Sequence, residues 1–509
     1  MDFKKMKFNI ELKCIAASFS IIGIVLSIIN FINNRSLWTD EATLSLNIIN
    51  KPIYELLQPL DYNQVAPVGF LLVEKFFASL LGNTDWSLRI FPIISFFLSI
   101  FLIYSVTQKI LKNKLFGLFT AAFFATSFIT LSYSSEVKQY MTDITFGLLI
   151  LLGTIIYNEN GFKNKWWLYS ILGIVSIWFS NVSILLLFSS GLYSMYKTYH
   201  SIEKKYLRLV ITLGLWFFSF VIYYALFIYN HPTKDMMINY WQNAGGFMPQ
   251  DILSADFYKS LFFKMIMFFS LLSSSMFTLL LAPLFLFGFF FLAKKKREIL
   301  YLLVSPLILH LVLSYLQLYP FSKRLILYLY PSLLIIIFSG FFFIHSLLKG
   351  NQQRLLYILP LLLTANILLL IRYGFPIEKE EIKKSMSYLN PRLINGDNIY
   401  VYYGATAAFN FYKEQFNLKI DDADIILTSG NRNNWSNYQE PILKLNDSVW
   451  ILFSHIYWIK NEEKMQEEEF ILNIFRDEGY QIIDEQKYRG SSVYHAIRIM
   501  PKPNNVYEK

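Results

Sequence analysis

The chain has 509 residues, of which 55% are hydrophobic and only 16% are charged, whereas soluble domains average about 25% charged residues. Together with 18% aromatic residues, this composition excludes a water-soluble enzyme, a disordered low-complexity chain and a collagen-like or coiled-coil rod. A single cysteine, Cys14, excludes a disulfide scaffold and a zinc ribbon. The net charge of +10 is uneven, because the first 373 residues hold 30 Lys+Arg against 16 Asp+Glu. Basic loops beside apolar segments are typical of membrane proteins, in which they set the orientation of the chain. Because this accounts for the positive charge, no nucleic-acid partner is expected.

Apolar segments long enough to cross a hydrocarbon core of about 30 Å recur through these 373 residues. They predict about eleven transmembrane helices, at residues 14–33, 88–110, 115–132, 141–157, 166–180, 182–198, 207–229, 276–294, 298–317, 324–347 and 355–372. Two more apolar stretches, 65–82 and 260–275, are interrupted by charged residues. We expect these two to be interfacial or re-entrant helices.

Basic residues gather in alternate loops, which predicts the orientation of the chain. They are Lys4, Lys5, Lys7 and Lys13, then Lys109, Lys112 and Lys114, then Lys197, Lys204, Lys205 and Arg208, and finally Lys294, Lys295, Lys296 and Arg297. If these loops are cytoplasmic, the amino terminus is cytoplasmic too. The loops 34–87, 133–140, 230–275 and 318–323 and the carboxy-terminal tail then lie outside a bacterial inner or plasma membrane.

The composition changes to that of a soluble domain after residue 373. Short buried strands are predicted at 399–403, 425–428 and 449–453, and helices at 405–416 and 461–478. This alternation predicts a small extracytoplasmic α/β domain over 374–509, following a transmembrane module over 1–373. Ser454 and His455 follow the third strand, but no Asp or Ser arrangement around them in the sequence indicates a catalytic triad.

Residues 36–42 are the most informative part of the first outer loop. Asp40 and Glu41 are adjacent and lie close to Trp38. Such a pair suits a general base beside a charge stabiliser, or a divalent cation site. A structural interpretation also stands, in which Thr39 caps a helix and the two acids occupy its first turn, where the helix dipole favours negative charge.

The rest of this loop adds a Pro-containing apolar stretch with Pro67, and then Gly82 followed by Arg89 with the spacing G-x-x-x-x-x-x-R. This order resembles the first outer loop of the GT-C superfamily of glycosyltransferases. That superfamily of polytopic enzymes includes protein O-mannosyltransferases and the lipid A aminoarabinose transferase. The resemblance implies a GT-C-like helical module with a soluble outer domain.

A second match covers residues 133–140, which contain Glu136, Lys138 and Tyr140. The family commonly shows a Ser-x-Glu-Ala-Arg-x-Tyr-like element here. Val137 replaces the Ala and Lys138 replaces the Arg, so positive charge is kept and bidentate geometry is lost. The alternative interpretation is that these side chains only anchor two helix ends at the membrane interface.

A third match covers residues 319–324, which resemble a late basic, aromatic and Pro-containing element of the family. Lys323 and Arg324 would lie on the outer side, against the positive-inside bias. The resemblance implies contact with a lipid-linked phosphate, for which an Arg fork is well suited. Snorkelling of both side chains to the interface is the alternative.

The resemblance as a whole implies transfer of a sugar from a polyprenyl-phosphate donor to a lipid, glycan or protein acceptor, with inversion at the anomeric carbon. It implies Asp40 as the general base and Lys138 with Arg324 as the phosphate clamp. Tyr140 and Lys323 are further substrate-binding candidates. Glu41 and Glu136 either orient the acceptor or hold a divalent metal ion, and membrane lipids are expected neighbours.

Two other classes of function stay open. The same charges suit the translocation path of a lipid or polysaccharide transporter, although we find no internal repeat of the kind that many transporters have. A catalytically inactive scaffold whose tail binds envelope partners is the other alternative. A transporter should tolerate loss of a base, whereas a transferase should not.

Overall fold

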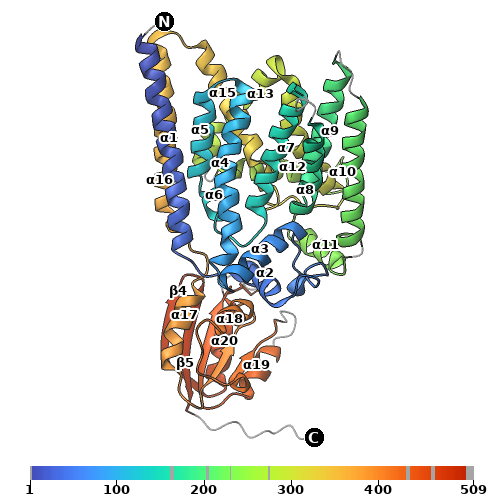
Figure 1. Cartoon of the computed structure of the whole chain (residues 1–509). Coiled ribbons are helices and arrows are strands. Elements are labelled where there is room, and N and C mark those ends of the chain that lie inside the picture. Colours follow the sequence, from blue (N-terminus) through green and yellow to red (C-terminus); the bar gives the residue numbers. More distant parts are fainter. Residues whose placement is uncertain are drawn as a thin grey trace. The chain divides into compact units, whose positions relative to one another are not determined.

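The computed structural model describes residues 3–160, 165–201, 206–229, 231–272, 275–430, 436–459 and 465–499. The chain forms two compact units, shown in Figure 1. The first comprises Met1–Ile32 and Pro52–Phe375, and the second comprises Asn33–Lys51 and Pro376–Lys509. The segment that contains Asp40 and Glu41 therefore folds with the carboxy-terminal residues, although it directly follows the first predicted span in the sequence.

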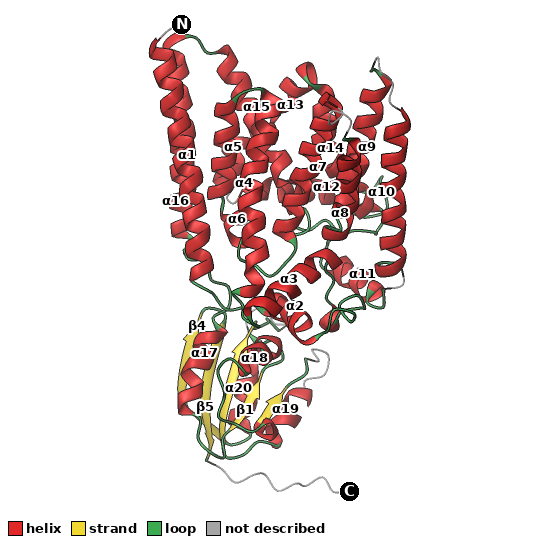
Figure 2. Cartoon of the chain, viewed as in Figure 1, coloured by secondary structure: helices red, strands yellow, loops and turns green. Residues whose placement is uncertain are grey.

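The first unit, called the helical unit below, consists of helices and loops in its described part (Figure 2). Its α-helices are α1 (Phe3–Ile32), α3 (Val68–Leu81), α4 (Ile90–Leu111), α5 (Lys114–Thr126), α6 (Phe128–Tyr133), α7 (Tyr140–Asn160), α8 (Trp166–Phe179), α9 (Ser183–Tyr199), α10 (Tyr206–Phe227), α11 (Lys234–Asn243), α12 (Ala255–Phe269), α13 (Ser275–Lys295), α14 (Arg297–Tyr315), α15 (Tyr330–Leu347) and α16 (Ile358–Arg372). Every predicted span overlaps one of them. Within the described residues, eight helices are long and apolar enough to cross a membrane, and α5 and α8 are shorter apolar helices.

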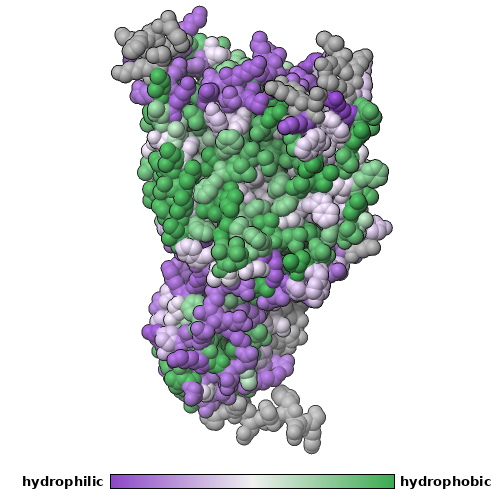
Figure 3. Space-filling model, in the orientation of Figure 1, coloured by the Kyte–Doolittle hydropathy of each residue, from purple (hydrophilic) through white to green (hydrophobic). Residues whose placement is uncertain are grey.

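The surface of the helical unit is hydrophobic where the long helices run. Figure 3 shows hydrophobic residues gathered over these helices on the face in view. Large apolar side chains of these helices are exposed, among them Phe101 of α4, Phe217 of α10, Leu279 of α13 and Leu361 of α16. Patches of this extent on soluble monomers are rare, so the surface matches a lipid environment. The predicted polytopic membrane protein is confirmed.

Contacts place three of the four basic groups, those at the ends of α4, α9 and α13, at one end of the helical unit. Lys109 Nζ lies 2.7 Å from a carboxylate oxygen of Glu159, and Lys197 Nζ lies 2.8 Å from one of Glu298. Lys296 Nζ also donates to the carbonyl of Ile110. The alternation of basic loops therefore agrees with the path of the chain, while the side that faces the cytoplasm stays a prediction.

One predicted span, 115–132, is broken at Ser127, which has an extended backbone (ψ 134°) and separates α5 from α6. Asn366 Nδ2 of α16 donates to the carbonyl of Thr126 at 3.0 Å. Thr130 Oγ1 donates to the carbonyl of Phe124. Side chains thus replace hydrogen bonds lost at the break, which makes it tolerable inside an apolar bundle.

The second unit, called the α/β unit below, carries a five-stranded sheet. Its elements are α2 (Thr39–Asn50), α17 (Ile382–Leu389), β1 (Asn398–Val401), α18 (Thr406–Lys413), β2 (Ile425–Leu427), α19 (Ser436–Leu443), β3 (Ser448–Ser454), α20 (Glu467–Asp477), β4 (Tyr480–Tyr488) and β5 (Ser491–Arg498). The predicted α/β class and the three predicted strands are confirmed. Residues 461–464 of the predicted second helix lie outside the described part. The β4–β5 hairpin was not predicted, because β4 carries mostly polar residues and, after Tyr480, alternates exposed and partly buried positions.

The strand order is β2-β1-β3-β5-β4, with β1 parallel to both β2 and β3. β5 runs antiparallel to β3 and to β4. Because β1 lies between β2 and β3, the chain reverses its direction of winding between β1 and β3. In open α/β sheets, ligands bind outside the carboxyl ends of the strands at such a reversal. The loops after Val401 and Ser454 border this position.

Candidate active site

The segment that leads into α2 is fixed by the rest of the α/β unit. The backbone N–H of Leu37 donates to the Tyr412 hydroxyl at 2.7 Å. Thr39 Oγ1 donates to the carbonyl of Gly404 at 2.9 Å. Gly404 lies between β1 and α18, and a Cβ there would come within 2.7 Å of the carbonyl oxygens of Ser454 and His455. The segment is thus bound at the winding reversal of the sheet.

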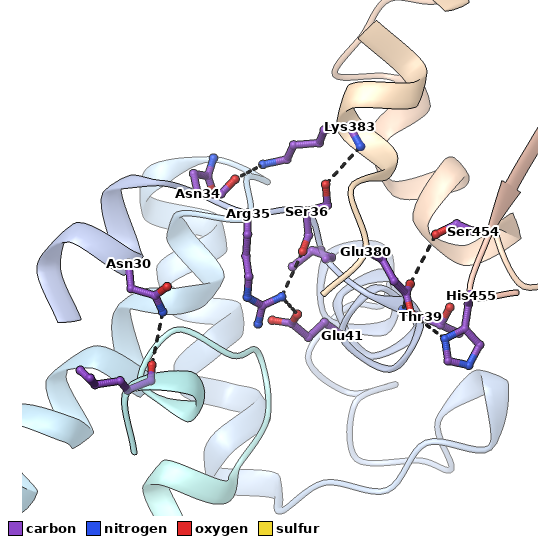
Figure 4. Close-up of polar contacts among 12 residues, drawn as sticks. Asn30, Asn34, Arg35, Ser36, Thr39, Glu41, Glu380, Lys383, Ser454 and His455 are labelled. Carbon is purple, nitrogen blue, oxygen red and sulfur yellow. Dashed lines mark hydrogen bonds and ion pairs between the residues drawn. The ribbon is translucent and has the colours of Figure 1, made fainter. Parts of the chain in front are cut away.

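Glu41 is a buried structural residue in this arrangement. Its carboxylate lies 2.5 Å from Arg35 Nη1, and the two side chains are 0% and 1% exposed. Arg35 Nη1 also donates to the carbonyl of Ser36 at 3.0 Å, so the pair closes the turn before α2 (Figure 4). Removing one partner of such a pair leaves a buried charge uncompensated. This contact gives Glu41 a structural role, while its predicted role toward a metal or an acceptor stays a prediction.

Asp40 differs from its neighbour, because it lies half-buried in the first turn of α2. Both acids are in that turn, as the structural interpretation expects, and the helix dipole favours them there. The capping part of that interpretation is wrong. Trp38 is the N-cap residue and forms no side-chain cap bond, whereas Thr39 is already helical and its hydroxyl donates to Gly404.

The second predicted element, residues 133–140, is buried in the helical unit. Glu136 is 1% exposed and Lys138 is 6% exposed. Lys138 Nζ donates to Gln64 Oε1 at 2.7 Å, and the rings of Tyr133 and Tyr140 meet edge to face at 5.2 Å. Snorkelling anchors extend toward water, whereas these charged side chains are enclosed. Burial therefore favours an internal polar site over the anchor interpretation.

The third predicted element, residues 319–324, is held by contacts with the loop after α11, with α14 and with α11. Phe321 N donates to the carbonyl of Gly246 at 2.7 Å, and a ring nitrogen of His310 lies 3.0 Å from the carbonyl of Pro320. The Arg324 guanidinium lies 5.6 Å from the ring centre of Trp241 in α11, a cation–π contact. Lys323 is exposed. The structure thus gives the two adjacent cations different surroundings.

Lys264 is a buried cation that the sequence shows only as an interruption of an apolar stretch. It is 3% exposed, and its Nζ donates to the carbonyls of Gly245 at 2.9 Å and Gly246 at 3.0 Å. A longer bond of 3.4 Å reaches the carbonyl of Phe321. Burial lowers the pKa of Lys264 to about 8. The lysine thereby joins the loop after α11 to the third element.

Glu380 of the α/β unit was missed by sequence reasoning, and His455 was noted there without a role. One Glu380 oxygen accepts from the backbone N–H of Thr39 at 3.3 Å, and the other lies 2.6 Å from His455 Nδ1. Figure 4 shows this carboxylate between Thr39 and His455. His455 has a left-handed backbone, φ 52°. The position of His455 directly after a predicted strand was the one feature of the sequence that could have indicated a functional role.

The predicted site residues are divided between the two units. Asp40 and Glu41 belong to the α/β unit, whereas Glu136, Lys138, Tyr140, Lys323 and Arg324 belong to the helical unit. In the part of the chain that the structure describes, no three His, Cys, Asp or Glu side chains gather as a metal site. A divalent ion at Glu41 or Glu136 stays a prediction.

Comparison with known proteins bears on this arrangement. Residues 64–224 match a family model described as dolichyl-phosphate-mannose-protein mannosyltransferase. The chain also has the fold of ArnT from Cupriavidus metallidurans, in structures of the apo state and of the complex with undecaprenyl phosphate. In both cases the TM-score is 0.52 at 12% identity, covering 94% of this chain and 97% of the other. No curated protein sequence matches significantly.

The resemblance to GT-C integral-membrane glycosyltransferases is confirmed. The chain has an ArnT-like fold, and the family model matches residues 64–224 within the helical unit. The region matched by the GT-C family model contains Gln64, Lys138 and Arg89. It does not extend to Asp40 or Arg324, so the roles of those two residues depend on the geometry and on chemistry.

Proposed function

We propose that the protein transfers a sugar from a polyprenyl-phosphate carrier to an acceptor on the outer side of the membrane. The match of residues 64–224 to a mannosyltransferase family model carries this proposal. The ArnT of the same fold was crystallised with undecaprenyl phosphate, which supports a donor of that class. Such a donor keeps its prenyl chain in the bilayer while its phosphate and sugar reach the outer side.

An apolar pocket of the helical unit suits part of a prenyl chain. It has a volume of about 200 Å³ and is lined by residues of α12 to α15, such as Phe268, Phe285, Leu303 and Ile336. Ser332 is the single hydroxyl in its lining. A site of this kind binds hydrocarbon by excluding water and offers little to a polar ligand. The pocket therefore supports a lipid-linked donor.

The proposed reaction is a direct displacement at the anomeric carbon. An acceptor hydroxyl or amine attacks this carbon as Asp40 takes its proton, while the bond from carbon to phosphate oxygen breaks and its electrons leave with the polyprenyl phosphate. Attack opposite the leaving group inverts the anomeric configuration. Proton transfer by a positioned base contributes about 10²- to 10⁴-fold. The Arg35–Glu41 pair sets the position of that base.

The departing phosphate needs charge stabilisation more than a general acid. Lys138 and Arg324 are the proposed clamp. Lys323 is proposed as an additional charge, and Tyr140 of the second element as a further substrate-binding side chain. Lys138 is held by Gln64, and Arg324 by Trp241. Glu136 is proposed to orient the acceptor.

The test is release of the carrier by the purified full-length chain in lipid nanodiscs. The probes are undecaprenyl-phosphate mannose and undecaprenyl-phosphate aminoarabinose, with an envelope extract from cells that lack the protein as the acceptor. We expect mass spectrometry to detect undecaprenyl phosphate and a glycosylated acceptor with one of the donors. Asp40→Asn is the control and should release neither. Movement of intact donor across vesicle bilayers without sugar transfer would refute the proposal and favour the transporter.

A further inference from the structure

The α/β unit contains a polar pocket that the proposed reaction does not use. Its volume is about 380 Å³, within the range of about 300–1,000 Å³ typical of small-molecule sites. Its lining comes from the segment before α17, the end of β3, the start of α20 and the β4–β5 hairpin. It therefore lies at the carboxyl end of β3, beside the winding reversal of the sheet where ligands commonly bind.

The charges that line this pocket are balanced. Lys379 and Lys487 supply two cations, and Glu380 and Glu468 supply two carboxylates. A phosphorylated ligand would face both carboxylates, and a cationic ligand would face both lysines. An uncharged ligand rich in hydroxyls suits such a mixture, because each hydroxyl donates to a carboxylate or accepts from an ammonium group.

Both carboxylates are held in place by hydrogen bonds from the unit itself. Glu380 is bound by His455, by Thr39 N and, at 3.4 Å, by Ser454 Oγ. Glu468 accepts from the hydroxyls of Ser492 and, at 3.0 Å, of Tyr494. Fixed acceptors lose little conformational entropy when a ligand binds, so the lining is pre-organised.

Tyr488 lines the pocket, and two tryptophans lie next to its lining residues. The C–H faces of a sugar ring pack well on aromatic rings. The ring of Trp38 lies 6.1 Å from that of His455, and Lys379 Nζ lies 4.4 Å from the Trp38 ring centre. Trp458, whose backbone bridges to the pocket residue Gln466, is 55% exposed. Charged hydrogen-bonding groups beside aromatic rings are the combination that a sugar requires.

The pocket residues contact the two residues that precede the proposed base. Glu380 lines it and binds the backbone N–H of Thr39, the residue before Asp40. His455 lines it and contacts Trp38. We propose that this pocket is the acceptor subsite and that it binds an uncharged, hydroxyl-rich glycan next to Asp40. This inference rests on the proposed transferase function and narrows its acceptor class from lipid, glycan or protein to glycan.

Binding of the full-length protein to an array of neutral, sulfated and phosphorylated glycans tests the inference. We expect binding to neutral glycans only, and at least about tenfold weaker binding by Glu468→Gln and by Lys487→Met, the scale of one charged hydrogen bond. Glu440→Gln, at an exposed position of α19 outside the pocket, is the matched control and should bind normally. Unchanged thermal melting would show that the pocket variants fold.

The outcomes separate this inference from the proposed function. Asp40→Asn should keep glycan binding and lose sugar transfer. Preference for phosphorylated or sulfated glycans, absence of binding to neutral ones, or normal binding by both pocket variants would overturn the subsite. Neutral glycan binding that depends on the pocket, in a wild-type protein that transfers no sugar from either donor, would overturn the transferase and leave the glycan site intact.

Discussion

The segment before α2 and the loop before α15 each present two adjacent charged residues, and the fold treats the members of each pair differently. In the first, Glu41 is completely buried against Arg35, whereas Asp40 is half-buried. In the second, Arg324 lies over Trp241, whereas Lys323 is exposed. Neighbours in a motif therefore need not share a function, because one member can hold the turn while the other meets the substrate.

The largest expected effects separate the two acids of the first segment. Asp40→Asn should lower sugar transfer by about 10²- to 10⁴-fold with little change in thermal stability. Glu41→Gln should lower the free energy of unfolding by about 3–5 kcal/mol, because the buried Arg35 then loses the carboxylate with which it is paired. Turnover and thermal melting, measured on both purified variants, check this. Near-normal turnover of Asp40→Asn would remove it as the base.

A double variant sharpens the same comparison. Replacing both members of the buried pair, as in Arg35→Met with Glu41→Leu, removes the stranded charge and should regain much of the stability lost in Glu41→Gln. If this double variant also regains transfer, Glu41 acts only by positioning the turn. Stable protein that stays inactive would instead assign Glu41 a direct role in the reaction.

The proposed phosphate clamp gives the next largest effect. Lys138→Met and Arg324→Met should each weaken donor binding or transfer by about 1.5–3 kcal/mol, the scale of a hydrogen bond to a charged group. The double variant should be non-additive if both cations contact one phosphate. The donor-concentration dependence of transfer measures this. Lys323→Met, at the exposed neighbour of Arg324, is the matched comparison and should change transfer less than Arg324→Met.

Lys264 provides a smaller effect with a defined pH dependence. Its folded pKa of about 8 lies below the ordinary 10.5, so the unfolded chain binds this proton more tightly. The resulting penalty on stability is present below pH 8 and fades as the pH rises toward 10.5. Lys264→Met should remove this rise in the free energy of unfolding. Melting curves between pH 7 and 10.5 check it, and identical pH profiles would contradict the assignment.

The smallest effect on transfer is expected from a cysteine variant that tests the membrane orientation, because it should leave transfer unchanged. With Cys14→Ser as the background, Asp477→Cys puts a thiol at an exposed position near the end of α20. A membrane-impermeant maleimide should label it in intact cells, because the basic loops predict that the carboxy-terminal residues are outside. Labelling only after permeabilisation would reverse the orientation and remove the outer acceptor site.

Much of this protein follows from its sequence because the determining signals are local. Apolar length predicts the membrane helices, since a bilayer requires each span to satisfy its own backbone hydrogen bonds. β1 and β3 were predicted for a related reason, because buried central strands are continuous apolar runs. The edge strand β2 is an apolar run too and was predicted from the same pattern. The first two motif elements indicated a GT-C glycosyltransferase, which the match over residues 64–224 supports.

Only the tertiary structure shows which charged residues form buried ion pairs or hydrogen bonds that stabilise the fold. Arg35 is bound to Glu41, Lys264 to carbonyls of Gly245 and Gly246, and Glu380 to Thr39. These partners include residues 341 positions apart, and their pairing depends on which loops the sheet and the bundle bring together. No local pattern encodes this, because a carboxylate has the same sequence signature whether it meets a buried cation, a backbone N–H or a substrate.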